Sequence, residues 1–243
     1  MEINKIIEAV ENFAPLSEAE DWDNSGWQIE AEVKETSKVL TALDVNDNTV
    51  EQAINEGCNL ILSHHPVFFS PVKTITPSFI TKAIKNNIGI YSAHTNLDKA
   101  KGGVNEAFAS LCGFPDVELL YEFVKYQKLD TPQDMKGLIE RVKGAFGIKT
   151  LKIANLNKAN FSTIAFCSGA GQDYIEILDK SGIDVYMTAD IKYHQAQSAK
   201  RMTIIDIGHF NSEYCAKQVF KNILSDINVE VIEAKEKDVF EYI

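Results

Sequence analysis

Residues 38–69, KVLTALDVNDNTVEQAINEGCNLILSHHPVFF, decide the fold. The apolar run at 38–45 predicts a strand, 48–57 predicts a helix that stops at its glycine, and 58–63 predicts a second strand. Unbroken apolar runs of this length are typical of strands that are buried on both faces of a parallel sheet. The segment therefore predicts a β-α-β unit whose second strand ends directly at a His-His pair.

The same alternation of strands and helices continues on both sides of this unit. Further strands are predicted at 88–93, 117–125, 151–156, 161–167, 184–188, 202–207 and 229–233, and further helices at 3–14, 77–87, 103–112, 131–146, 173–181, 193–201 and 211–225. This order predicts the α/β class, with two α/β units of mixed sheets flanked by helices and a metal site between them. We expect residues 1–115 plus 206–243 to form the first unit and 116–205 the second.

The composition limits the classes of partner. The chain of 243 residues has a formal net charge of −11, which disfavours nonspecific binding to nucleic acid or to an anionic membrane surface. No apolar stretch has the length of a membrane span, and the acidic, amphipathic N-terminal stretch predicts a helix rather than an export signal. Four scattered cysteines without a CxxC pair predict reduced thiols in a cytoplasmic protein.

Of the five histidines, His64 and His65 form the most distinctive local feature. Successive side chains of a strand point to opposite faces, so adjacent histidines do not readily bind one ion together. At a strand end, with Pro66 keeping His65 extended, they can instead serve two neighbouring ions. The alternative is an ordinary pair of loop histidines, one solvated and one hydrogen-bonded, and for an isolated pair it is the more common case.

Two further clusters follow predicted strands. His94 and Asp98 lie between a strand and a glycine-rich turn, where Asp98 is either a metal ligand or a turn and capping residue. His209 and Glu213 are four residues apart at a predicted helix start, so both side chains can face one point. Glutamate is also favourable at a helix start without any metal.

Imidazole and carboxylate ligands gathered at strand ends suit zinc, iron, manganese or nickel, and a carboxylate can bridge two ions about 3.5–4 Å apart. Together the three clusters therefore indicate a metal site. Asp23 and Asp44 lie near strand or turn ends, where they either hold ligand histidines in place or act as caps and turn residues. The predicted ligands are His64, His65, Asp98, His209 and Glu213.

These motifs resemble those of the GTP cyclohydrolase 1 type 2 homolog family, and the match runs nearly from end to end. The segments that carry the resemblance are DWDNSG (21–26), LSHHPVFF (62–69), SAHTNLDKAKGGVN (92–105), FCSGAGQDYI (166–175), DVYMTADIKYHQA (184–196) and IDIGHFNSE (205–213). The order His-His-Pro, His-Thr-Asn-Leu-Asp and Gly-His-x-x-x-Glu is highly specific. Ser25 and Trp27 stand where small and aliphatic residues are usual in the family.

The resemblance implies a dinuclear-metal protein that assembles as a toroidal homohexamer. It implies the same five metal ligands, with Glu213 bridging the two ions. His94 and His194 match positions near the site, and we treat them as the catalytic candidates, as proton shuttles. The chain lacks the domain that is inserted in longer members, which implies the compact form. The family's name implies GTP cyclohydrolase activity by name only.

Together these features predict a metal-dependent hydrolase that acts on a small phosphorylated or nucleotide-like substrate. The alternative is a non-catalytic metal-binding scaffold, such as a metal store or an interaction module. Residues 169–171, Gly-Ala-Gly, fail the dinucleotide fingerprint because Tyr174 occupies its third glycine position. They predict a tight strand-to-helix turn. For Trp22 and Trp27 we expect core or loop packing rather than a stacking platform.

Overall fold

The computed structural model describes residues 1–241 and divides into two compact units. The first unit comprises Met1–Gly103 and Ala216–Lys237, and the second comprises Val104–Cys215 and the residues from Asp238 onward. Each unit is a sheet flanked by helices, which confirms the predicted α/β class. The stretches 104–115 and 206–215, which the sequence analysis assigned to the first unit, lie in the second.

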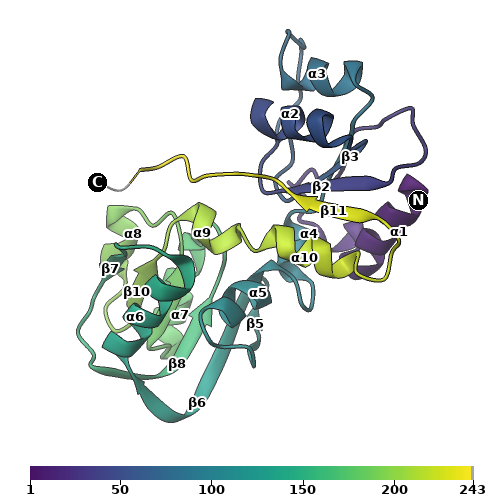
Figure 1. Cartoon of the computed structure of the whole chain (residues 1–243). Coiled ribbons are helices and arrows are strands. Elements are labelled where there is room, and N and C mark those ends of the chain that lie inside the picture. Colours follow the sequence, from purple (N-terminus) through teal and green to yellow (C-terminus); the bar gives the residue numbers. More distant parts are fainter. Residues whose placement is uncertain (242–243) are drawn as a thin grey trace. The chain divides into compact units, whose positions relative to one another are not determined.

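The first unit has a five-stranded sheet in the order β1-β4-β3-β2-β11. Strands β11, β2, β3 and β4 are parallel, and β1 pairs antiparallel with β4. Figure 1 shows the C-terminal β11 lying against the early strand β2, as their residue pairing requires. In chain order the elements are α1 (Ile3–Phe13), η1 (Leu16–Glu18), β1 (Gly26–Ile29), β2 (Lys38–Ala42), α2 (Asp47–Glu56), β3 (Leu60–Ser63), α3 (Phe79–Lys85), β4 (Gly89–Ser92), α4 (Thr95–Lys99), α10 (Ala216–Ile223) and β11 (Glu230–Glu233).

The β2-α2-β3 unit forms where residues 38–69 predicted it. The Asn46 side chain caps α2 by accepting hydrogen bonds from the backbone N–H groups of Asn48 and Thr49. Gly57 ends the helix in the left-handed conformation at φ 72°, which glycine adopts without steric cost. These local signals set the two strands parallel, so their carboxyl ends lie at the same edge of the sheet.

Both faces of this sheet are covered, so its inner strands β2, β3 and β4 are buried over almost their whole length. Leu40 and Ile61 pack with the α2 residues Val50 and Ala53 on one face. On the other side, α10 packs against β2 and against α1. Fully buried apolar strands of this kind carry the unbroken apolar runs seen in the sequence.

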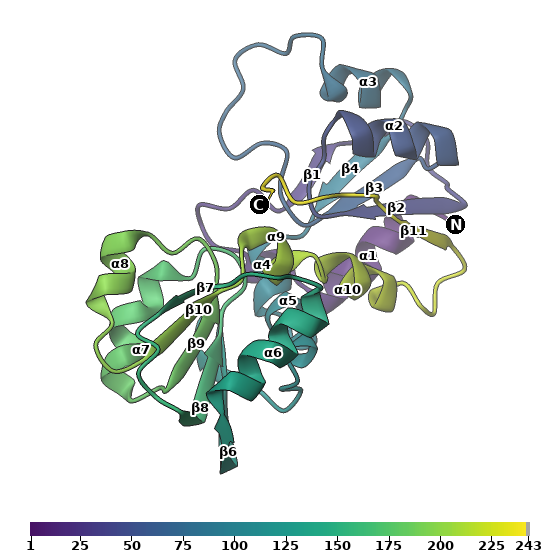
Figure 2. The ribbon, with the colours of Figure 1, turned by 60° about the vertical axis from the view of Figure 1, so that its left-hand side comes forward.

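The second unit has a six-stranded sheet in the order β5-β6-β8-β9-β10-β7. Strands β8, β9 and β10 are parallel, and the outer pairings are antiparallel. Figure 2 shows α7 and α8 on one side of this sheet and α5 and α6 on the other. In chain order the elements are α5 (Val104–Leu111), β5 (Glu118–Tyr121), β6 (Val124–Asp134), α6 (Met135–Phe146), β7 (Lys152–Ala154), β8 (Asn160–Phe166), η2 (Gln172–Tyr174), α7 (Ile175–Ser181), β9 (Val185–Thr188), α8 (Tyr193–Ser198), β10 (Thr203–Asp206) and α9 (His209–Glu213).

One predicted helix start was wrong. The sequence predicts a helix from residue 131, but β6 continues to Asp134 and α6 begins at Met135. Pairing with β8 is interrupted between Lys128 and Gln133, so Pro132, which has no N–H group, costs no ladder hydrogen bond there. Asp134 caps the helix that begins at Met135, because its side chain accepts a hydrogen bond from the Gly137 N–H at 2.7 Å.

Asp179, in α7, organises the segment that leads into β10. Its Oδ1 accepts hydrogen bonds from the backbone N–H groups of Lys200, Arg201 and Met202 at 3.1, 2.8 and 2.8 Å. Burial raises the pKa of the Asp179 carboxyl, but these three hydrogen bonds outweigh it and hold the pKa below its ordinary value of 3.8. The ionised carboxylate therefore stabilises the fold.

We expect Asp179→Asn to destabilise the protein at neutral pH by about 2 kcal/mol, because the variant keeps an acceptor oxygen but loses its charge. The lowered pKa means that this contribution is present above pH 3.8 and is lost as the pH falls through the folded-state value. Urea unfolding of both proteins, from neutral pH into the acid range, should show the difference shrinking. A difference that stays constant with pH would contradict this account, and Glu176→Gln, exposed on the same helix, is the matched control.

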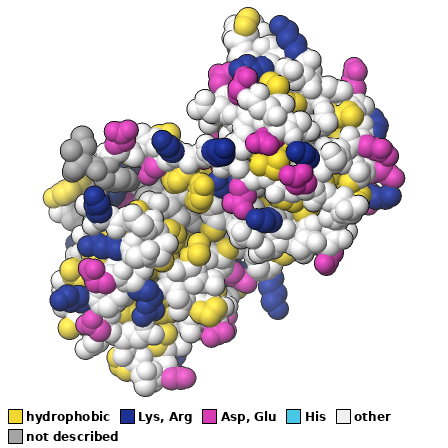
Figure 3. Space-filling view, viewed as in Figure 1, with side chains coloured by type: hydrophobic (Ala, Val, Ile, Leu, Met, Phe, Trp, Pro, Cys, Tyr) yellow, Lys and Arg dark blue, Asp and Glu magenta, His cyan; other side chains and the backbone are white. Residues whose placement is uncertain are grey.

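Two surface properties bear on function. Among residues 1–241, none of the helices combines the length and the apolar character that crossing a membrane requires. On the face drawn in Figure 3, acidic and basic side chains are interspersed rather than separated into regions of one sign. That face therefore carries no extended basic surface of the kind that holds a nucleic-acid backbone.

Candidate metal centre

His64 follows directly on β3 and is fully buried. Its Nδ1 lies 3.0 Å from the carbonyl oxygen of Ala93, the residue that follows β4. A carbonyl oxygen only accepts, so Nδ1 carries the proton and Nε2 carries the lone pair. That Nε2 lies 3.5 Å from Oδ1 of Asp98, a buried residue of α4. His64 and Asp98, predicted as ligands, thus direct ligand atoms toward one another within the first unit.

His65 lies beside His64, and it too has its Nδ1 in contact with an oxygen, which leaves its Nε2 for a ligand. Its Nδ1 lies 2.8 Å from Oδ1 of Asp44, which follows β2, and its ring centroid lies 5.2 Å from that of His64. Asp44 therefore holds the ring of His65, the role that the sequence analysis weighed against simple turn chemistry.

His94 completes a trio of imidazoles in the first unit. Ligand atoms of His64, His65 and His94 all lie within 4.8 Å of one another, which is close enough for a metal ion to be held among them. His94 Nδ1 lies 2.9 Å from Oδ1 of Asp23. All three histidines lie beyond the carboxyl ends of β3 and β4, where ligands of parallel sheets bind.

Asp23 is held firmly as an anion. Its Oδ2 accepts hydrogen bonds from the hydroxyl groups of Thr95 and Ser25 at 2.6 and 2.8 Å. Burial raises the pKa of this carboxyl, but the hydrogen bonds from His94 and the two hydroxyl groups outweigh burial, and the pKa falls well below its ordinary value. A carboxylate that stays ionised keeps the proton of His94 on Nδ1.

The second unit has a pair of candidate ligands in the short helix α9. His209 and Glu213 start and end this short helix, and His209 Nε2 lies 2.7 Å from Glu213 Oε2. His209 Nδ1 lies 2.8 Å from Oδ2 of Asp190. The two side chains therefore converge on one point, as the four-residue spacing predicted, and Glu213 is buried whereas His209 is partly exposed.

The four histidines share one pattern of hydrogen bonding. In each, Nδ1 contacts an oxygen that accepts its proton, which leaves Nε2 as the nitrogen that can bind a cation. Metal-binding histidines almost always have their second ring nitrogen held in this way. The chemistry of the donor set therefore fits a divalent metal. The holding groups are Ala93 O for His64, Asp44 for His65, Asp23 for His94 and Asp190 for His209.

Gly169 gives Glu213 the space that it occupies. Gly169 lies in the turn after β8 at φ +60°, and its N–H donates to the Ser212 hydroxyl at 2.9 Å. A Cβ atom at this position would overlap the carboxylate oxygen Oε1 of Glu213 and would lie 3.5 Å from the His209 ring. The Gly-Ala-Gly turn is thus shaped around the candidate ligands of the second unit.

We expect Gly169→Ala to displace the Glu213 carboxylate and to weaken metal binding about 10- to 100-fold, an effect of the size seen when groups that orient ligands are lost. Chelator competition with zinc measures the affinity. Gly147→Ala is the matched control, because Gly147 has a similar φ of +64° but no atom within 4 Å of an added Cβ. Equal metal affinities for the two variants would contradict the role assigned to Gly169.

The remaining catalytic candidate, His194, is exposed on α8, where its ring contacts that of Tyr193. The metal-binding groups found among residues 1–241 do not include it. Asp190 was missed by the sequence analysis. It lies two residues after β9 with a positive φ of 58°, so its sequence context resembles an ordinary turn. Its place beyond the carboxyl end of a buried strand was the signal that could have identified it.

Known proteins are similar to this chain over most or all of its length. A protein of Clostridium perfringens named GTP cyclohydrolase 1 type 2 homolog is 35% identical over 100% of both chains. A protein of the same name from Clostridium acetobutylicum is 34% identical over 88% of this chain and 86% of its own. These matches confirm the resemblance noted in the sequence.

Solved structures agree with the fold. The crystal structure of the Staphylococcus aureus hypothetical protein SA1388 superposes with a TM-score of 0.92 at 27% identity, over 100% of this chain and 99% of that one. Reduced HcgD from Methanocaldococcus jannaschii superposes with a TM-score of 0.84 at 28% identity, over 97% and 98% of the two chains. Residues 1–238 match the family described as Duf34/NIF3 (NGG1p interacting factor 3). On these grounds the chain belongs to the Duf34/NIF3 family.

Proposed function

We propose that this chain is a metal-dependent hydrolase that acts on a small phosphorylated or nucleotide-like substrate. The observation that carries the proposal is the orientation of the four histidines, each with Nδ1 held by an oxygen, which leaves Nε2 to bind a metal ion or, in His94, to exchange a proton. The name of the relatives, GTP cyclohydrolase 1 type 2 homolog, points to the same substrate class.

We further propose a centre of two divalent ions, which the family resemblance implies. Both units place their donors beyond the carboxyl ends of parallel strands, and the mixed imidazole and carboxylate set suits zinc, iron, manganese or nickel. By the family resemblance, Glu213 would supply a carboxylate ligand to this centre. The proposed ligands are His64, His65 and Asp98 from the first unit and His209 and Glu213 from the second.

A bound pair of divalent ions lowers the pKa of a bound water toward neutrality and polarises an oxygen of the substrate. The chain's own part is orientation and proton transfer. His94, held through Nδ1 by an ionised Asp23, presents Nε2 as the atom that accepts or releases a proton beside the other two imidazoles. His194 remains the second candidate for this role.

The direct test reconstitutes the protein with zinc, manganese or iron, measures metal content, and screens nucleotides, phosphoesters and cyclic amides for turnover. Activity that disappears in His64→Ala and in Glu213→Ala, with the circular dichroism spectrum unchanged, supports the hydrolase. Silence across the screen with metal bound favours the non-catalytic scaffold. Fewer than one ion per chain after reconstitution contradicts both.

Asp190→Ala is expected to weaken metal binding about 10- to 100-fold although it removes no ligand, because His209 loses the acceptor that fixes its proton on Nδ1. Chelator competition over a range of pH measures the change, and Asp173→Ala, an exposed aspartate of the same unit, is the control. Unchanged affinity in Asp190→Ala would remove His209 from the proposed ligand set.

The resemblance also supports a homohexamer, which light scattering would detect as six times the chain mass of 27.1 kDa. A monomer or dimer at micromolar concentration would contradict the assembly. The proposal keeps the cytoplasmic location predicted from the scattered cysteines. The four cysteines are buried in the structure.

A further inference from the structure

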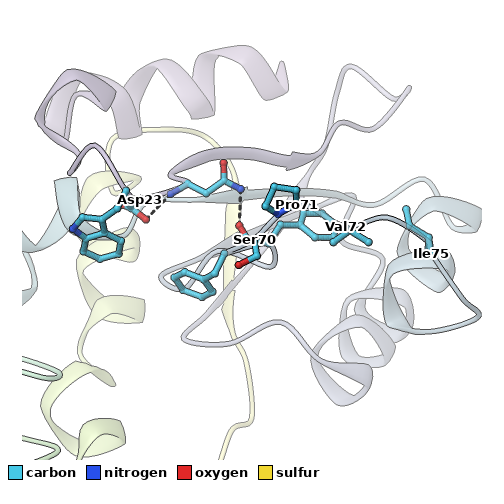
Figure 4. Close-up of a pocket in the computed structure, with 9 residues that line it drawn as sticks. Asp23, Ser70, Pro71, Val72 and Ile75 are labelled. Carbon is cyan, nitrogen blue, oxygen red and sulfur yellow. Dashed lines mark hydrogen bonds between the residues drawn. The ribbon is translucent and has the colours of Figure 1, made fainter.

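A pocket of about 450 Å³ lies in the first unit beside the histidine trio. One wall is the segment Trp22–Asn24, and the other is the segment Phe68–Val72 together with Ile75. Figure 4 shows Asp23 on one side of this pocket and Ser70, Pro71, Val72 and Ile75 on the other. The second wall begins only three residues after His65, so one stretch of chain carries both the candidate ligands and the pocket.

The pocket is lined by large apolar side chains that remain accessible. Trp22 is 63% exposed, Phe69 55%, Val72 51% and Ile75 52%. Single exposed apolar residues are ordinary, but four around one hollow mark a binding surface. Of the two alternatives expected for Trp22, core packing and loop packing, its exposure excludes the core.

Two of these residues are aromatic, and both lie against the same histidine. The ring centroids of Trp22 and Phe69 lie 6.0 and 5.7 Å from that of His94, and both rings stand nearly perpendicular to it, at 79° and 82°. A planar group that contacts either ring is therefore placed next to the imidazole that we propose as a proton shuttle.

The charged and polar residues of the pocket indicate which class of ligand it can bind. None of the nine described residues that line it is a lysine or arginine, so the pocket is not built to hold a phosphate group. The one charged residue, Asp23, already accepts hydrogen bonds from His94, Thr95 and Ser25. Apolar walls with aromatic rings suit the uncharged, planar part of a ligand, which gains by stacking.

We propose that this pocket binds the aromatic ring of the substrate, while the polar remainder of the molecule extends toward the histidines. The role of the polar remainder rests on the proposed function, and the inference specifies the substrate class of that function further. It selects a substrate with a planar ring, such as a nucleotide, over a phosphoester without one.

The test uses Trp22 as its own reporter. The sequence has two tryptophans, so Trp27→Phe leaves Trp22 as the only one. Fluorescence is titrated with guanosine 5′-monophosphate and with ribose 5-phosphate, on zinc-loaded and on metal-free protein. The mononucleotide is expected to quench Trp22 saturably and ribose 5-phosphate is not, because only the former has a ring to stack.

A second variant makes the result specific to the pocket. Phe69→Ala should raise the dissociation constant of the mononucleotide about 10-fold, which corresponds to the loss of one stacking contact. Phe240→Ala, which removes a phenylalanine that is 68% exposed and lies outside the pocket, should leave it unchanged. Equal binding of the two probes, or an unchanged dissociation constant in Phe69→Ala, overturns the inference. A change in oligomeric state in Phe69→Ala without a change in affinity also overturns it, because the surface would then serve contact between copies.

Failure of the inference and failure of the proposed function give different results. Ring-dependent binding to a protein that holds less than one ion per chain supports the pocket and contradicts the hydrolase. Metal-dependent turnover that is unaffected by Phe69→Ala supports the hydrolase and contradicts the pocket.

Discussion

Replacing Glu213 by glutamine is expected to lower the metal content from the two ions per chain that we propose to at most one, because a neutral amide is a much weaker metal ligand than a carboxylate. The variant keeps the shape of a side chain that is only 5% exposed, so the change acts on charge and not on packing. Elemental analysis after reconstitution and desalting measures the effect.

The same variant should lose the stability that metal binding confers. A ligand present at a thousand times its dissociation constant stabilises the folded state by about 4 kcal/mol, and this gain should appear when zinc is added to the metal-free native protein. In Glu213→Gln the melting temperature should respond far less to zinc or to a chelator. Glu140→Gln, 66% exposed, is the control that should behave as the native protein does. Two ions retained in Glu213→Gln would remove Glu213 from the centre.

The second large effect is expected at a buried lysine. Lys217, in α10, is only 1% exposed, and its Nζ donates to the carbonyl oxygen of Ala234 at 2.8 Å and lies 3.5 Å from Oε2 of Glu236. We expect Lys217→Met to destabilise the protein by about 3–5 kcal/mol, because it leaves the buried Glu236 carboxylate without its cation. Urea unfolding measures the loss.

Glu236 allows a second test of whether the unpaired charge causes the loss of stability. Its carboxylate also accepts the backbone N–H groups of Leu43 and Asp44 at 2.9 Å each, just after β2. Changing Glu236 to glutamine in the Lys217→Met background should therefore recover part of the lost stability, since the amide oxygen still accepts and no unpaired charge remains. Lys221→Met, on the same helix but 49% exposed, should cost less than about 1 kcal/mol. Equal losses for the two lysine variants would contradict the argument.

The buried strands were predictable because their signal is local. Leu60–Ser63 and Val185–Thr188 are short apolar runs bounded by turn residues, and both became fully buried parallel strands. The strand β1, Gly26–Ile29, was missed because it is short, carries the polar Gln28 and pairs antiparallel at the sheet edge. Such a strand is determined by its partner β4 and not by its own pattern.

The last predicted helix shows a different limit. Residues 211–225 have one continuous helical pattern, yet the structure has α9 and α10 separated at Tyr214 and Cys215. The break coincides with the passage from the second unit to the first. Periodicity reports which residues are apolar, but it does not report that the two halves are buried in different cores.

At the candidate site, the candidate ligands are easier to identify from the sequence than the aspartates that contact them. His64 and His65 stand out because adjacent histidines at a strand end have few structural uses. Asp23 and Asp44 were named with capping as the alternative. In the structure each contacts a histidine, and Asp23 also accepts a hydrogen bond from the Thr95 N–H group at the start of α4. Asp190 makes an equivalent contact, but nothing in its neighbourhood distinguishes it from a turn aspartate, since its partner is distant in sequence.

The discontinuity of the first unit has a consequence for biosynthesis. Strand β11 and helix α10 leave the ribosome only after the whole of Val104–Cys215 has been made. Until then β2 has an open edge, which is a site for wrong strand pairing. The second unit can therefore fold before the first, although most of the first unit is synthesised earlier. Nascent chains stalled before Ala216 should be cut by protease around Lys38–Ala42, a segment that becomes resistant once β11 has left the ribosome and paired with β2.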